Sequence, residues 1–212
     1  MEELVYIPEG SVVLEGVLSI PEGAQGIVLF AHGSGSSRHS PRNVFVAQVL
    51  NSAGLGTLLI DLLTREEDAV YEARFNIDHL TSRLVTATKW IREREFTAKM
   101  NLGYFGASTG AAAALKAAAL MQDTVSAVIS RGGRPDLAGS ELHHVKAPVL
   151  LIVGGNDDVV IGLNQDAYAE LSCIKKMEII SGASHLFEEP GTLEEVATLA
   201  IKWFQSYLNK EQ

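Results

Sequence analysis

Short, continuously apolar segments recur along the chain and alternate with segments of helical periodicity. The apolar segments span residues 26–31, 57–61, 101–105, 125–130, 148–153 and 177–180. Runs of this length without polar alternation are typical of strands buried on both faces, as in a parallel sheet. The segments between them predict helices: one begins at Ser40-Pro41 and ends at Gly54, and an amphipathic one runs from Ile77 to near Phe96.

The remaining helical segments follow the later strands. An alanine-rich helix over residues 111–121 is apolar nearly all round and should be buried. Two further helices are expected, around residues 163–171 and after a capping box made by Thr192 and Glu195. The charged segment 64–76 is read as a surface loop or short helix.

The N-terminal region has a different pattern. Two strands at residues 5–7 and 12–20 flank the turn sequence Pro8-Glu9-Gly10, so they should pair antiparallel. With the alternating strands and helices that follow, the pattern predicts a doubly wound, mostly parallel α/β sheet in a single domain over residues 1–212, with no large lid domain. In such sheets ligands bind beyond the carboxyl ends of the strands.

Composition and charge narrow the function classes. The 212 residues, 47% hydrophobic and 20% charged, fit a soluble globular domain. The net charge of −9 argues against a nucleic-acid partner. No apolar run is long enough to span a bilayer and no signal peptide is recognised, so neither membrane nor export is expected. The single cysteine, Cys173, cannot form an internal disulfide, and a reducing cytoplasm is the simplest location.

The clearest chemical motif is Gly106-Ala107-Ser108-Thr109-Gly110, which fits G-x-S-x-G. An apolar strand precedes it and an alanine-rich helix follows it, as a nucleophile elbow requires. The turn holds the serine hydroxyl above the end of the sheet, and the amides at the start of the helix face a developing oxyanion. Ser108 is therefore the predicted nucleophile.

Chain order selects the partners of Ser108. The order in the α/β-hydrolase fold is serine, acid, histidine. Of the six histidines only His185 follows the acidic loop at Asp157 and Asp158, so His185 is the predicted base. Asp157 is preferred to its neighbour Asp158 as the acid, and Asp61 is interpreted as structural because it precedes the serine.

The oxyanion hole needs two backbone donors. One should be the N–H of Thr109, directly after the nucleophile. The other should come from the loop that begins at His32, and Ser34 is preferred over Gly33 and Gly35. The ring of His32 is expected to brace this loop.

These motifs resemble those of the α/β-hydrolase superfamily, and most closely its dienelactone-hydrolase-related branch. The matching segments are Ala31-His32-Gly33-Ser34-Gly35, Gly103-Tyr104-Phe105-Gly106-Ala107-Ser108-Thr109-Gly110, Leu151-Ile152-Val153-Gly154-Gly155-Asn156-Asp157 and Ala183-Ser184-His185-Leu186-Phe187. The resemblance implies a serine hydrolase that cleaves carboxylic esters or lactones through an acyl-enzyme, with no metal or organic cofactor. Dienelactone hydrolases proper carry cysteine at the elbow, where this chain has Ser108, so the dienelactone substrate itself does not carry over.

Arginines near the predicted site bear on the substrate. Arg38, Arg42, Arg131 and Arg134 lie in or next to loops at the active end of the sheet. They suggest that a small ester or lactone with an anionic group is bound, with Arg131 and Arg38 as the named contacts. The alternative is that they pair with acids such as Asp61 or Asp136. The short connection between residues 129 and 148 leaves no room for a helical lid, which favours an open site.

Two other functions fit the same motifs. One is acyl transfer or perhydrolysis on the same triad, with another nucleophile replacing water. The other is ligand binding without catalysis on a retained hydrolase fold, although such proteins usually lose a triad residue.

Overall fold

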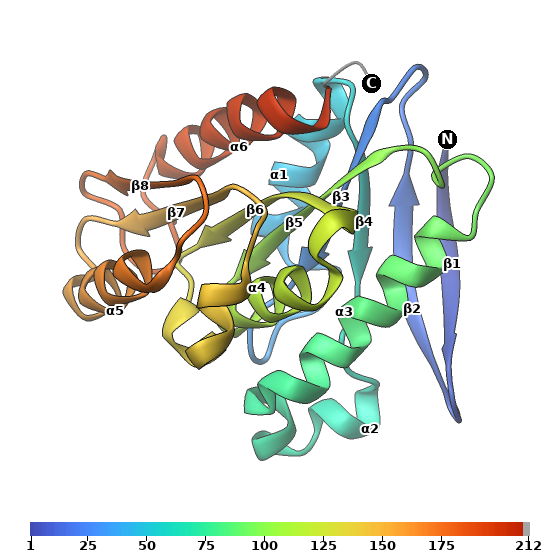
Figure 1. The fold of residues 1–212 in the computed structure, drawn as a ribbon, viewed down its shortest axis with the longest axis horizontal. Helices are drawn as coiled ribbons and strands as arrows, with labels where there is room; N and C mark the ends of the chain where they lie inside the picture. Colours follow the sequence, from blue (N-terminus) through green and yellow to red (C-terminus); the bar gives the residue numbers. More distant parts are fainter. Residues whose placement is uncertain (210–212) are drawn as a thin grey trace.

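The computed structural model describes residues 1–209, within which eight strands form one sheet (Figure 1). The order across the sheet is β1-β2-β4-β3-β5-β6-β7-β8. The strands are β1 (Glu2–Glu9), β2 (Val12–Ser19), β3 (Gly26–Ala31), β4 (Gly56–Ile60), β5 (Asn101–Ala107), β6 (Val125–Arg131), β7 (Val149–Gly154) and β8 (Lys175–Ile180). β1 pairs antiparallel with β2, and β2 pairs antiparallel with β4. The neighbouring strands β4, β3, β5, β6, β7 and β8 all run parallel to one another. The predicted mostly parallel α/β sheet with an antiparallel N-terminal pair is confirmed.

Helices cover both faces of the sheet (Figure 1). The α-helices are α1 (Pro41–Ser52), α2 (Arg65–Asp68), α3 (Ile77–Arg92), α4 (Thr109–Met121), α5 (Asp158–Glu170) and α6 (Thr192–Leu208). α1 and α6 contribute buried residues to the core on one face, and α3, α4 and α5 to the core on the other. Three 3-10 segments complete the described elements: η1 (Tyr71–Phe75), η2 (Gln122–Thr124) and η3 (Pro135–His144).

The two cores explain why the strand segments are continuously apolar. In β3, Ile27 and Leu29 face the α3–α4 side, whereas Val28 and Phe30 face the α1–α6 side. Successive side chains of a strand point to opposite faces, so a strand with helices on both sides needs apolar residues at every position.

Local capping shows where the sequence patterns were reliable. The Ser40 side chain accepts a hydrogen bond from the Asn43 N–H at 3.5 Å at the start of α1, with Pro41 in its first turn, as predicted. The predicted capping box of Thr192 and Glu195 is wrong. Gly191 is the N-cap of α6, and the Thr192 hydroxyl donates to the Glu189 carbonyl oxygen at 2.7 Å instead. α5 also begins earlier than expected, at Asp158.

The segment between β4 and α3 and the connection between β6 and β7 are both short. The first forms α2 and η1, and a capping box of Thr64 with Glu67 starts α2. The second forms η3. Neither adds a further domain to the described residues, in agreement with the predicted absence of a lid domain.

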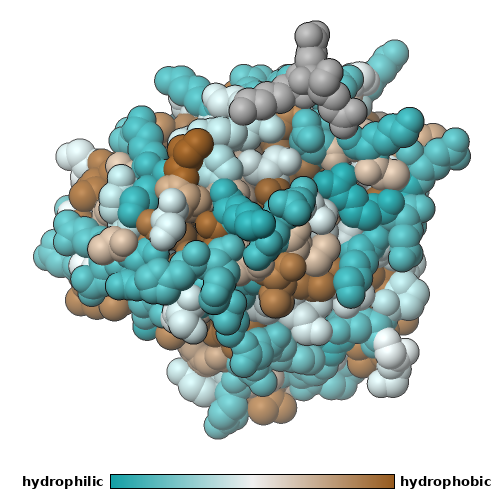
Figure 2. All heavy atoms as spheres, in the orientation of Figure 1, coloured by the Kyte–Doolittle hydropathy of each residue, from teal (hydrophilic) through white to brown (hydrophobic). Residues whose placement is uncertain are grey.

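The surface is mixed in character. Figure 2 shows hydrophilic side chains over most of the visible face, with apolar residues scattered among them. Among residues 1–209, no helix is long and apolar enough to cross a membrane.

Candidate active site

Ser108 lies in the sharp turn between β5 and α4. Its backbone has φ 50° and ψ −122°, a conformation that non-glycine residues rarely adopt. The turn is possible because its neighbours are small: a Cβ at Gly106 would collide with the Cα of Ala111, and a Cβ at Gly110 would collide with the Ala31 carbonyl oxygen. The strand–turn–helix context that the G-x-S-x-G motif requires is therefore present, with a strained serine at its apex.

His185 and Asp157 lie on loops after β8 and β7, and their side chains meet. The Nδ1 atom of His185 lies 2.7 Å from Oδ2 of Asp157. A carboxylate oxygen accepts hydrogen bonds, so Nδ1 is the donor in this pair. The Asp157 side chain is mostly buried, whereas Asp158 is exposed as the first residue of α5. Between these neighbours, the geometry supports Asp157 as the partner of His185.

The end of β6 places the serine turn beside the histidine loop. The Ser108 N–H donates to the Arg131 carbonyl oxygen at 3.4 Å. A Cβ on the next residue, Gly132, would lie 2.9 Å from the His185 carbonyl oxygen and 3.7 Å from its Cε1 atom. Residues 131 and 132 thus touch both Ser108 and His185, which gathers the three predicted triad residues at one edge of the sheet.

The loop after β3 approaches Ser108 from the other side. A Cβ at Gly33 would lie 3.0 Å from the Cβ of Ser108. Ser34 follows in a turn closed by a hydrogen bond from the Ser36 N–H to the Gly33 carbonyl oxygen. Thr109 is the first residue of α4, where backbone N–H groups have no acceptor within the helix. Thr109 therefore directly follows the nucleophile, and Ser34 directly follows Gly33, whose backbone approaches Ser108.

His32 braces this loop, as predicted. Its Nε2 accepts a hydrogen bond from the Leu62 N–H at 3.0 Å, and its Nδ1 lies 2.9 Å from the Gly33 carbonyl oxygen. Burial lowers the pKa of His32, although the Gly33 hydrogen bond and Asp61 act in the opposite direction. Because Nε2 accepts from Leu62, the proton of the ring lies on Nδ1, which donates to the Gly33 carbonyl oxygen.

Three of the four arginines near the site have acidic partners. Arg38 forms ion pairs with Asp61 and Glu15. Arg134 binds Asp136, with 2.8 Å between Nη2 and Oδ2, and Arg42 binds the exposed Glu188 at 3.2 Å. For Arg38 and Arg134 the structure thus shows the predicted alternative, pairing with Asp61 and Asp136.

Arg131 differs from the others because it is buried and has no acidic partner among residues 1–209. Its side chain is 4% exposed, and Nη2 donates to the Asn43 Oδ1 at 3.2 Å. The guanidinium carbon lies 5.7 Å from the centre of the Phe187 ring. Desolvation, followed by repulsion from Arg42, lowers the pKa of Arg131 to about 10, so the side chain remains charged at neutral pH.

The sequence patterns did not identify Asn43 and Phe187 as the residues that contact Arg131. Asn43 lies in the first turn of α1 and is fully buried, and Phe187 is buried with a positive φ of 56°. The sequence around Asn43 does not indicate a contact with Arg131, because the two residues are 88 positions apart and meet only in the folded chain.

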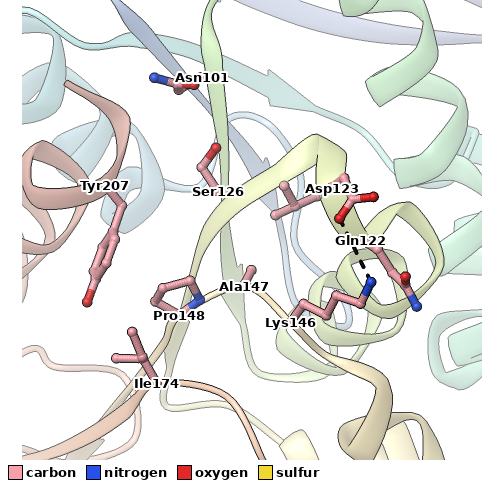
Figure 3. A pocket seen from close by; sticks show the side chains of 10 residues that line it. Asn101, Gln122, Asp123, Ser126, Lys146, Ala147, Pro148, Ile174 and Tyr207 are labelled. Carbon is pink, nitrogen blue, oxygen red and sulfur yellow. Dashed lines mark ion pairs between the residues drawn. The ribbon is translucent and has the colours of Figure 1, made fainter. Parts of the chain in front are cut away.

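Cavities are present at both ends of the parallel strands. One, of about 430 Å³, is at the opposite edge of the sheet, where Lys146 pairs with Asp123 (Figure 3). The other, of about 240 Å³, lies beside the loop after β3 and is lined in part by His32, Arg38 and Asp61. This loop also approaches Ser108 through Gly33. Within residues 1–209, no group of three or more histidine, cysteine or acidic side chains could hold a metal ion.

The sheet, the strained serine turn and the loops that hold the histidine–aspartate pair are those of the α/β-hydrolase fold. The model of the dienelactone hydrolase family matches residues 14–209, and the chain belongs to that family. A crystal structure of a dienelactone hydrolase from Anabaena variabilis is 59% identical, with a TM-score of 0.96 over 98% of both chains. Est1E from Butyrivibrio proteoclasticus shares the fold at 16% identity, with a TM-score of 0.83 over 98% of this chain and 99% of its own.

Two Mycobacterium tuberculosis proteins, both named "Putative phosphoribosyl transferase", are also similar. Each is 55% identical over 207 residues, which are 98% of this chain and 47% of the relative. The chain thus spans about half the length of these relatives. Family and fold together show a chain of the dienelactone hydrolase type.

Proposed function

We propose that the protein is a serine hydrolase that cleaves small carboxylic esters or lactones, with Ser108, His185 and Asp157 as its catalytic triad. The observation that carries this proposal is the 2.7 Å contact between His185 and Asp157, made beside a serine in the strained turn. In this proposal Nδ1 of His185 donates to Asp157, and Nε2 is the atom that takes the proton of Ser108.

The reaction would proceed in two halves. In the first, Ser108 Oγ attacks the acyl carbon while its proton passes to His185 Nε2. The N–H groups of Thr109 and Ser34 would stabilise the negative oxygen that forms. The bond to the leaving oxygen then breaks, and His185 returns the proton to that oxygen, which leaves an acyl-enzyme.

In the second half, water replaces the alcohol. His185 takes a proton from the water as its oxygen attacks the acyl carbon, and the ester bond to Ser108 breaks. The proton then returns to Ser108 Oγ and the carboxylic acid leaves. Throughout, Asp157 holds the histidine tautomer and stabilises the transient imidazolium.

A fluorophosphonate probe tests this function, because it labels only an activated serine. The expected result is stoichiometric labelling of the wild-type protein and none of the Ser108→Ala variant. Turnover of short p-nitrophenyl esters and lactones should disappear in parallel. A folded wild-type protein that neither reacts with the probe nor hydrolyses any ester would instead support the non-catalytic ligand-binding alternative.

Transfer reactions are the second candidate. Acyl transfer or perhydrolysis requires only that an alcohol or peroxide replace water in the second half. Adding an alcohol to the assay and measuring the ratio of new ester to free acid separates transfer from hydrolysis.

The name of the M. tuberculosis relatives raises phosphoribosyl transfer as a further possibility. We assign that activity to the part of those relatives outside the matched region, because the matched 47% corresponds to a dienelactone hydrolase family chain. Release of diphosphate from 5-phosphoribosyl diphosphate by this chain alone would contradict the assignment.

A further inference from the structure

The environment of Arg131 contains a positive charge that the described residues do not balance. Arg131 is almost fully buried, and its Nε has no hydrogen-bond partner among residues 1–209. The charged group that acts on it most is another cation, Arg42. A buried guanidinium without an acidic partner is costly, so such residues are normally paired.

Two more features make the same place attractive to an anion. The Asn43 side chain that contacts Arg131 lies in the first turn of α1, where helix amides favour negative charge. Arg42 occupies the same turn, and its side chain is 28% exposed beside Glu188. An anion could therefore enter from the Arg42 side by replacing Glu188 as its partner.

The position relative to the triad indicates which part of a substrate would reach this place. His185 returns its proton to the leaving oxygen, so the leaving group lies on the histidine side of Ser108, and the acyl oxygen on the Ser34 side. Arg131 belongs to the histidine side: its guanidinium contacts Phe187, two residues after His185, and Gly132 adjoins the imidazole.

We propose that Arg131, Arg42 and Asn43 form an anion site for the leaving group, so that the preferred substrates are esters of alcohols bearing a carboxylate or a phosphate. This rests on the proposed serine hydrolase activity. Guanidinium groups suit both anions because their N–H donors match paired oxygens.

Three acetate esters test the site: acetylglycolate, acetoxyethyl phosphate and the neutral methoxyethyl acetate. Arg131→Gln should raise KM about 10- to 100-fold for one or both anionic esters and change the neutral ester less than about twofold. The carboxylate and phosphate arms identify the preferred anion. Equal effects on charged and neutral esters would overturn the proposal.

Asn43→Asp provides a nearly isosteric second variant. It places a carboxylate against Arg131 and should cancel the preference for anionic esters while the protein remains folded. Arg134→Gln is the matched control, since Arg134 follows the same strand but is already paired with Asp136, and it should retain the preference. A preference that survives Asn43→Asp would overturn the proposal.

Monoethyl succinate, which carries its charge on the acyl side, tests the placement. Its KM should be unaffected by Arg131→Gln, and a selective loss for this ester alone would overturn the assignment to the leaving group.

Thermal unfolding with inorganic phosphate or succinate separates this proposal from the activity itself. At least one anion should raise Tm for the wild type and for Ser108→Ala, but not for Arg131→Gln or Asn43→Asp. That result with no ester turnover would sink the proposed function and leave the anion site standing. Absence of any shift in the wild type would overturn the anion site.

Discussion

Arg38 and Arg131 lie on opposite sides of Ser108 and differ in how their charges are balanced. On the side of the loop after β3, here called the oxyanion-loop side because it holds the proposed donor Ser34, Arg38 is held by Asp61 and Glu15, and Arg74 binds Asp68 at 3.0 Å. On the histidine-loop side, Arg131 is more deeply buried and contacts an amide and an aromatic ring.

The difference teaches how to interpret an arginine near a site. A guanidinium whose partners are carboxylates of the same chain contributes to the architecture, because its donors are already used. A guanidinium that is desolvated without such a partner retains donors and charge for a ligand. If solvent exposure alone were used to choose a ligand contact, Arg38 would be preferred to the more deeply buried Arg131.

The largest expected effect concerns Ser108, where the two sides meet. Ser108→Ala should lower kcat for ester hydrolysis by about 10⁴-fold or more, with the fold intact by circular dichroism. Ser126→Ala, which alters a serine in the cavity at the opposite edge, should leave the rate unchanged. Full turnover in a folded Ser108→Ala protein would contradict the assignment of the nucleophile.

The next effect belongs to the histidine-loop side alone. Asp157→Asn should lower kcat by about 10³- to 10⁴-fold, because the hydrogen bond that fixes the His185 tautomer is changed. Asp158→Asn, one residue away and exposed, should change kcat less than about threefold. Steady-state kinetics of the two variants measures both effects. A larger loss for Asp158→Asn would identify Asp158, and not Asp157, as the acid of the triad.

Replacing each arginine by methionine sharpens the comparison through stability. Arg38→Met leaves the mostly buried Asp61 carboxylate without its ion pair and should lower the free energy of unfolding by about 1–3 kcal/mol. Arg131→Met removes an uncompensated buried charge and should stay within about 1 kcal/mol of wild type or exceed it. Urea unfolding measures both. A greater loss for Arg131→Met would show that its contacts with Asn43 and Phe187 outweigh its charge.

The smallest effect is a pH dependence on the oxyanion-loop side. Burial lowers the pKa of His32 in the folded protein below its ordinary value of 6.5. The unfolded chain therefore binds more protons as pH falls below 6.5, so stability decreases in that direction. One group can contribute at most about 1.4 kcal/mol per pH unit.

The matched variants isolate this contribution. His32→Gln should reduce the loss of stability between about pH 6.5 and 5.5 by up to about 1 kcal/mol, relative to the loss in wild type. His39→Gln, in the same loop but exposed, should leave the slope unchanged. Urea unfolding at several pH values gives the slopes, and identical slopes for His32→Gln and wild type would show that His32 does not resist protonation.

The sequence by itself determined the sheet, the serine turn and the chain order of the three candidate triad residues. Buried parallel strands need apolar residues at every position, and the elbow needs Gly106 and Gly110 for steric reasons, so both leave local patterns. Capping was less secure: a Thr192–Glu195 spacing matched the capping-box pattern, but the loop before α6 placed Gly191 at the cap instead.

Only the tertiary structure decided which charges are balanced. Arg38 and Arg131 look alike in the sequence, each next to a loop at the active edge. They differ in their neighbours in the folded chain. Glu15 and Asp61 pair with Arg38, whereas Asn43 and Phe187 contact Arg131. The residues that share the Arg38 and Arg131 side-chain hydrogen bonds are 23 and 88 positions apart in the sequence, respectively. Charge compensation is a property of three-dimensional neighbours, because Coulomb energy and desolvation depend on distance in space and on burial.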